Sequence, residues 1–136
     1  MAKEGTILAL DIGAARIGLA LASYVAKLPQ PYRTIPNDQM TVSSLKAICD
    51  KEHVTQLVAG LPRGMQGQAT AQTAAVEEYG TNLAQRLALP LAWQDEAVTS
   101  VNAEQELVSR RAAYNKADID ALAATYILED YIHENL

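Results

Sequence analysis

The chain has 136 residues, 49% of them hydrophobic and 20% charged, which is the balance of an ordinary soluble globular protein. This length predicts a single domain spanning residues 1–136, and no apolar run approaches the roughly 20 residues that a membrane span needs. The formal net charge of −5 argues against a generic nucleic-acid coat, because phosphate binding needs local positive potential. The single cysteine, Cys49, allows no internal disulfide, and we expect a buried thiol in a cytoplasmic protein.

The first apolar segments predict a β-hairpin. Two runs, Ile7–Leu10 and Ile17–Ala22, are apolar at every position, which is typical of strands buried on both faces. Gly13 lies in the polar break between them, and we expect it to take a positive φ and turn the chain tightly. Asp11 extends the first strand with a carboxylate, which is costly to bury unless it is paired, hydrogen-bonded or bound to a metal. An Asx-type turn cap and a carboxylate displayed at the end of a rigid strand both fit this residue.

The rest of the chain predicts further strands that alternate with helices. The patterns indicate a strand over 32–35, a helix from an N-cap at Thr41 to Glu52, and a strand over 54–59. They then indicate an alanine-rich helix over 70–87, a strand over 91–94, a helix from Thr99 or Ser100 to 109, and a last helix over 115–134. An antiparallel meander of three strands followed by αβαβα makes an α/β fold with a mixed five-stranded sheet and helices on both faces. This order matches the ribonuclease H-like topology.

Acidic side chains stand at the ends of these predicted elements. Asp11 ends the first strand, while Asp95 and Glu96 follow the last strand and point to opposite faces, so only one of them can share a site with Asp11. Asp120 lies on the last helix in line with an apolar stripe formed by Ala123, Ala124 and Ile127. Carboxylates without a ligating histidine or thiolate make a hard oxygen site that suits Mg²⁺ or Mn²⁺. Two such ions activate water and hold the leaving oxygen of a phosphodiester, so no nucleophilic side chain is required.

Basic side chains fall mostly in predicted loops, whereas much of the acid lies in predicted helices. We expect these bases to form a phosphate-binding rim on an otherwise acidic protein: Arg16, Arg63, Arg110, Arg111 and Lys116. Solvated surface charge is the usual explanation for either set, so the segregation by itself is only an indication.

Four motifs, in the same order along nearly the whole chain, resemble the YqgF (RuvX) family. They are Leu10-Asp-Ile-Gly-Ala-Ala-Arg-Ile-Gly18, Val58-Ala-Gly-Leu-Pro62, Asp95-Glu-Ala-Val-Thr-Ser100 and Asp120-Ala-Leu-Ala-Ala-Thr-Tyr-Ile-Leu128. The resemblance implies a RuvC-type nuclease on a ribonuclease H-like fold. It also implies that the catalytic, metal-binding acids are Asp11, Glu96 and Asp120, which selects Glu96 over Asp95.

The resemblance further implies a spatial arrangement and includes some departures. By analogy with the fold, the strand that ends at Gly60 lies between the strands bearing Asp11 and Glu96, and a small residue there leaves room for metal and phosphate. Ala97 stands where the family commonly has an arginine. Where an asparagine and an acid are usual, this chain has Gly64 and Gln66. These differences concern substrate binding more than the metal site.

Several functions remain open at this stage. The leading expectation is a metal-dependent endonuclease for structured RNA, maturing the 5′ end of pre-16S rRNA in ribosome biogenesis as a monomer or weak homodimer. Its partners would be pre-rRNA or ribosomal precursor particles, with branched DNA as the alternative. A DNA junction resolvase needs a symmetric dimer, and the sequence has no obvious dimer helix. A ribosome-assembly factor that binds without cutting fits Ala97. Asp11-Ile-Gly13 also resembles the first phosphate loop of the actin, Hsp70 and sugar-kinase fold, which needs two such domains.

Overall fold

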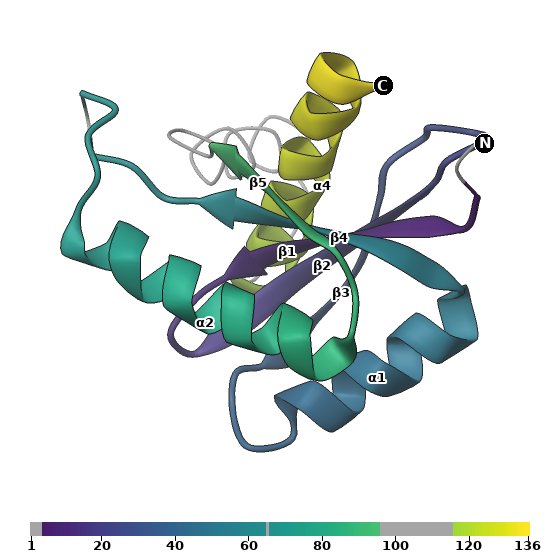
Figure 1. The fold of residues 1–136 in the computed structure, drawn as a ribbon, viewed down its shortest axis with the longest axis horizontal. Helices are drawn as coiled ribbons and strands as arrows, with labels where there is room; N and C mark the ends of the chain where they lie inside the picture. The colour runs from purple at the N-terminus through teal and green to yellow at the C-terminus, as the bar shows by residue number, and fades with distance from the viewer. Residues whose placement is uncertain (1–3, 65, 96–115) are drawn as a thin grey trace.

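A five-stranded sheet in the order β3-β2-β1-β4-β5 forms the middle layer of the protein. The computed structural model describes residues 4–64, 66–95 and 116–136. The strands are β1 (Thr6–Ile12), β2 (Arg16–Ser23), β3 (Gln30–Pro36), β4 (Val54–Leu61) and β5 (Leu91–Asp95). The described helices are α1 (Thr41–Glu52), α2 (Ala71–Leu87) and α4 (Lys116–Asn135), with α4 on one face of the sheet and α1 and α2 on the other (Figure 1).

The strand connections are those that the sequence predicts. β1, β2 and β3 form an antiparallel meander, whereas β4 pairs parallel to β1 and β5 pairs parallel to β4. The mixed five-stranded sheet with helices on both faces is therefore confirmed. The predicted helix that begins at Thr99 or Ser100 lies outside the described residues. Among the helices that the structure describes, none combines the length and apolarity of a membrane crossing.

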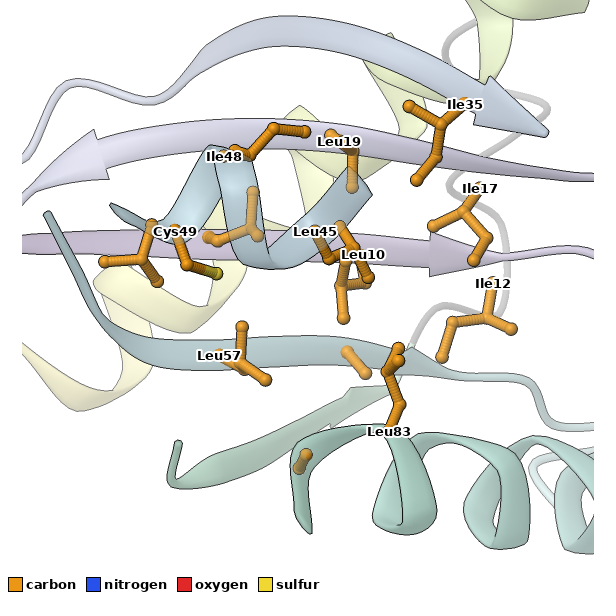
Figure 2. Packing of buried hydrophobic residues seen from close by; sticks show 14 of the residues in the cluster. Leu10, Ile12, Ile17, Leu19, Ile35, Leu45, Ile48, Cys49, Leu57 and Leu83 are labelled. Carbon is orange, nitrogen blue, oxygen red and sulfur yellow. The ribbon is translucent and has the colours of Figure 1, made fainter. Parts of the chain in front are cut away.

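The sheet is buried on both faces, as the uninterrupted apolar runs predict. On one face, Leu10, Leu19 and Leu57 pack against Leu45 of α1 and Leu83 of α2 (Figure 2). On the other face, a second cluster joins three strands to α4; its members include Ile7, Ala9, Ala20, Val58, Ala124 and Ile127. Each fully buried leucine or isoleucine contributes about 1.5–3 kcal/mol relative to an exposed one, so both layers hold the sheet.

Cys49 of α1 is buried between that helix and the sheet, as expected for a structural thiol. Burial, together with the nearby Asp50, raises the pKa of this thiol to about 11. Because the thiolate is the reactive form, a thiol with such a pKa is unreactive at neutral pH.

The start of α1 differs from the sequence prediction. Thr41 is the first helical residue and not the N-cap, a position taken by Met40 without any side-chain cap hydrogen bond. The Thr41 hydroxyl instead accepts a hydrogen bond from the Asp38 N–H at 3.0 Å and donates to the Pro36 carbonyl at 3.1 Å. The preceding turn thus satisfies the hydroxyl that would otherwise cap the helix.

Gly80, in the middle of α2, allows Trp93 of β5 to lie against the helix. A Cβ at this position would approach Trp93 Cη2 to 2.6 Å. Gly80→Ala normally stabilises a helix by about 1 kcal/mol, but overpacking typically costs about 1–3 kcal/mol. We expect a net destabilisation of about 1 kcal/mol and a shift in the emission of Trp93, the one tryptophan of the chain. Urea unfolding followed by fluorescence measures both, and a Gly80→Ala protein more stable than wild type would contradict the packing argument.

Candidate functional site

Asp11 lies near the carboxyl end of β1 and points toward α4. Along β1 its side chain alternates with Leu10 and lies on the same face as Ala9, which packs in the cluster containing Ala124 of α4. Directly opposite Asp11 on β2 is Gly18. Asp11 is half-buried, so its carboxylate belongs to the surface between the sheet and α4 rather than to open solvent.

Gly18 brings the first turns of α4 onto the backbone of β2. A Cβ built on Gly18 would overlap the carbonyl group of Asp120 and approach the Ala121 nitrogen to 2.9 Å. Asp120 lies over Gly18, and Gly18 is the cross-strand partner of Asp11. Because cross-strand partners point to the same face, Asp11 lies beside Asp120. The sheet and helix thus place the acids of two distant segments next to each other.

Asp120 is held by an ion pair with Arg16. Arg16 Nε donates to Asp120 Oδ2 at 2.7 Å, with 38% of the arginine side chain and 21% of the aspartate side chain exposed. A pair this exposed contributes at most about 1 kcal/mol to stability. Its consequence for the site is electrostatic, since the guanidinium offsets the repulsion between the carboxylates of Asp11 and Asp120. The apolar stripe predicted to follow Asp120 is also confirmed: Ala123, Ala124 and Ile127 are fully buried.

The turn between β1 and β2 differs from the expectation for Gly13. Gly13 does not adopt a positive φ; among the described glycines, only Gly5 and Gly67 do so. Instead, the Gly13 N–H donates to the Arg16 carbonyl at 2.9 Å, and a Cβ on Gly13 would lie 2.8 Å from the same oxygen. The positive-φ prediction is therefore wrong, and close approach of the backbone is what this position requires.

Gly60 occupies the position that the resemblance implies. β4 lies between β1 and β5, and Gly60 is the residue after Ala59, which pairs with Leu10. The buried Gly60 therefore lies level with Asp11 and pairs with Gln94 on its other side. This row of residues forms the carboxyl ends of three parallel strands.

Asp95 does not share a face with Asp11. Gln94 faces α4, because its side-chain amide donates to Glu134 Oε2 at 2.7 Å, so strand alternation sends Asp95 to the opposite face. There Asp95 accepts a hydrogen bond from Arg63 Nε at 3.2 Å, with 66% of the aspartate side chain exposed. Glu96, the acid implied by the resemblance, lies outside the described residues.

The structure gives positions to only part of the predicted basic rim. Arg16 lies at the site, where it pairs with Asp120. Arg63 lies near the end of β5, because it pairs with Asp95, the last residue of that strand. Arg110 and Arg111 fall outside the described residues, and Lys116 is the first residue of α4. In the part of the chain that the structure describes, no group of three histidine, cysteine, aspartate or glutamate side chains is close enough to hold a metal ion.

Two residues at the site were not singled out from the sequence. Gly18 sits within a buried strand, where a glycine often marks a close backbone approach, and that signal was available. Asn37 follows the last residue of β3, and its side chain donates to the Gly13 carbonyl at 2.8 Å. Only its place in a Pro-Asn-Asp turn sequence distinguishes it, and that gives no indication of a contact with the hairpin.

The family model described as RuvX, Holliday junction resolvase, matches residues 5–134. The chain belongs to the RuvX family. A relative named "Putative pre-16S rRNA nuclease" from Chloroflexus aggregans is 37% identical over 96% of this chain and 94% of its own. Another with the same name, from Synechocystis sp., is 32% identical over 97% of this chain and 90% of its own.

Solved structures place the RuvX chain in the same fold as RuvC. Thermus thermophilus RuvC in complex with a Holliday junction substrate matches with a TM-score of 0.56 over 96% of each chain at 11% identity. A second Thermus thermophilus RuvC structure matches with a TM-score of 0.53 at 12% identity. The predicted ribonuclease H-like topology is therefore confirmed.

Proposed function

We propose that this RuvX protein is a metal-dependent endonuclease that processes the 5′ end of pre-16S rRNA in the cytoplasm. The names of its relatives favour that substrate, and membership of the RuvX family favours cleavage of a phosphodiester. The observation that carries the proposal is the juxtaposition of Asp11 and Asp120, which β1 and α4 bring together on either side of Gly18.

The donor groups at this juxtaposition fit a hard divalent cation. Asp11 and Asp120 offer carboxylate oxygens, which are the ligands that Mg²⁺ and Mn²⁺ prefer, and the neighbouring Gly60 adds no side-chain bulk. We propose Glu96 as the third ligand. When bound, the metal supplies activated water and stabilises charge on the scissile phosphate. The protein's own part is to hold the two aspartates at the ends of rigid elements, with Arg16 balancing their charge.

The decisive experiment is cleavage of a defined precursor RNA by the purified protein. A fragment spanning the 5′ end of 16S rRNA should be cut in Mg²⁺ or Mn²⁺ and remain intact in EDTA. A four-way DNA junction, tested in parallel at equal concentration, examines the second candidate function, which the description of the RuvX family favours. Binding of the RNA without cleavage in either metal would overturn the nuclease proposal and leave a non-cutting assembly factor.

Oligomeric state separates the two nuclease candidates further. A junction resolvase needs two active sites related by two-fold symmetry, whereas cleavage of one RNA strand needs a single site. We propose a monomer or a weak homodimer. Light scattering at assay concentration, with and without each substrate, measures this directly.

We expect Arg63 to contribute to phosphate binding although it already pairs with Asp95. Because the pair is exposed, a phosphate can compete for the guanidinium. Arg63→Ala should weaken RNA binding and lower the slope of log K against log salt by about one unit. Anisotropy titrations with labelled RNA between low and moderate KCl give this slope.

Arg33→Ala is the matched control for Arg63→Ala, because it removes the same charge from β3 at the far edge of the sheet. Its slope should equal that of wild type. Equal slopes for all three proteins would place the binding surface away from Arg63.

A further inference from the structure

The turn between β1 and β2 carries the candidate site but has little packing beneath it. Gly13 to Arg16 join the strand of Asp11 to the strand of Gly18. On the side away from α4, a solvent-open pocket of about 290 Å³ lies between this turn and α2. Ile12, Gly13 and Ala14 line it together with Val76 and Tyr79 of the helix. Hydrogen bonds to neighbouring segments can therefore contribute to holding the turn in place.

Asn37 makes two such contacts with the turn. Its backbone N–H donates to the Ala15 carbonyl at 2.9 Å, and its side-chain Nδ2 donates to the Gly13 carbonyl at 2.8 Å. The pairing of Pro36 with Arg16 is the last of the β2–β3 ladder. Asn37 is therefore the first residue beyond that ladder. One residue thus satisfies two carbonyls of a turn that lies outside the ladder.

Tyr79 fixes the orientation of the Asn37 amide. The Tyr79 hydroxyl donates to Asn37 Oδ1 at 2.9 Å, which leaves Nδ2 directed at Gly13. Burial raises the pKa of Tyr79, so the phenol keeps its proton at neutral pH and remains a donor. Tyr79 lies on α2, whose Val76 and Leu83 are buried in the core. The chain of contacts therefore runs from the core through Tyr79 and Asn37 to the turn.

We propose that Asn37 is a positioning residue for the candidate site. It holds the turn from Gly13 to Arg16, so that the Asp11 carboxylate and the Arg16 guanidinium stay beside Asp120. This inference rests on the proposed function for its effect on cleavage, but its effect on the Arg16–Asp120 ion pair stands independently.

The Arg16–Asp120 ion pair can be measured directly, without a cleavage assay. The ¹⁵N–¹H resonance of Arg16 Nε reports its hydrogen bond to Asp120 and is identified by its loss in Arg16→Lys. In Asn37→Ala this resonance should move to the position of a free guanidinium. In the cleavage assay kcat should fall about 10- to 100-fold, since small displacements of catalytic groups cost this much. KM should change less than kcat, because Arg16 is the one residue of the predicted phosphate-binding rim that the variant displaces.

Two further variants separate positioning from general stability. Asn37→Asp keeps the size of the side chain and an acceptor for Tyr79 but places an oxygen against the Gly13 carbonyl, so it should behave like Asn37→Ala. Tyr79→Phe removes only the outer hydrogen bond and should give a smaller shift in the same direction. Asn82→Ala, an exposed asparagine on the same helix, is the control and should leave resonance and kcat unchanged.

The outcomes distinguish this inference from the proposed function. An unchanged Arg16 resonance in both Asn37 variants overturns the positioning role, whatever happens to the melting temperature. If wild type cleaves neither RNA nor DNA, the proposed function fails, while the resonance still decides the role of Asn37. Should Asn37→Ala not fold, Tyr79→Phe and Asn37→Asp carry the same test.

Discussion

Asp11→Asn and Asp120→Asn should each lower the rate of RNA cleavage by at least about 10³-fold, which is about 4 kcal/mol of transition-state stabilisation. Asp11 near the carboxyl end of β1 and Asp120 of α4 lie beside each other on the α4 face of the sheet, and we propose both as metal ligands. Asparagine keeps the shape of the side chain but loses the charge that holds a divalent cation. Single-turnover cleavage of the precursor RNA in Mn²⁺ measures the loss, and Glu96→Gln should match it.

Asp95→Asn is the control for this series. Its carboxylate pairs with Arg63 on the other face of the sheet, so neutralising it should leave most of the activity. An inactive Asp95→Asn protein together with an active Glu96→Gln protein would reverse our assignment of the last strand.

Metal binding gives a second measurement on the same proteins. A ligand that binds only the folded state at one hundred times its Kd stabilises by about 2.7 kcal/mol, and wild type should show an increment of this kind with Mn²⁺. Asp120→Asn should gain little. Without metal, its melting temperature should stay close to that of wild type, because relief of carboxylate repulsion offsets the loss of the partly exposed pair with Arg16. A large Mn²⁺-dependent gain in Asp120→Asn would remove Asp120 from the ligand set.

Gly18→Ala should destabilise the protein by about 3 kcal/mol, at the upper end of what overpacking costs. A methyl group there would overlap the backbone of Asp120, and backbone cannot move aside as a flexible side chain does. For a chain of this length the melting temperature should fall by about 10 °C. Because α4 must lift from β2, cleavage should fall as well at temperatures where the variant remains folded.

Gly67→Ala is the matched control, since a Cβ there meets nothing within 4 Å. Its cost should be about 1 kcal/mol, which comes from its positive φ of 78° alone. Equal losses for the two glycines would mean that α4 does not press on β2 at Gly18.

Much of the fold follows from patterns that the sequence displays directly. Uninterrupted apolar runs identified the buried central strands, and the order of strands and helices was enough for the topology. The cap at Thr41 was wrong because its hydroxyl serves the preceding turn, a choice that depends on where Pro36 and Asp38 lie. Local signals cannot choose between two partners that are both near in sequence.

The candidate site was less predictable than the fold. Periodicity placed Asp120 in line with the apolar stripe of its helix, and the apolar run placed Asp11 at the end of its strand without indicating which face it takes. The choice of Glu96 came from family resemblance. The Arg16–Asp120 pair joins segments 104 residues apart, and no local pattern encodes such a contact. The sequence indicates that Gly13 is needed in the turn, but it cannot show why, because the absence of a Cβ permits close approach of the backbone as well as a positive φ.

The layer between α4 and the sheet has a consequence for the separation of the two aspartates. On this face many of the buried contacts are made by the methyl groups of alanines, among them Ala9, Ala20 and Ala124. The depth of this layer, and with it the span across which two carboxylates face a common ligand, is therefore a matter of side-chain volume. One added methylene at Ala20 would increase the distance between α4 and the sheet. Alanines with no chemical role of their own therefore help to set the separation of Asp11 and Asp120.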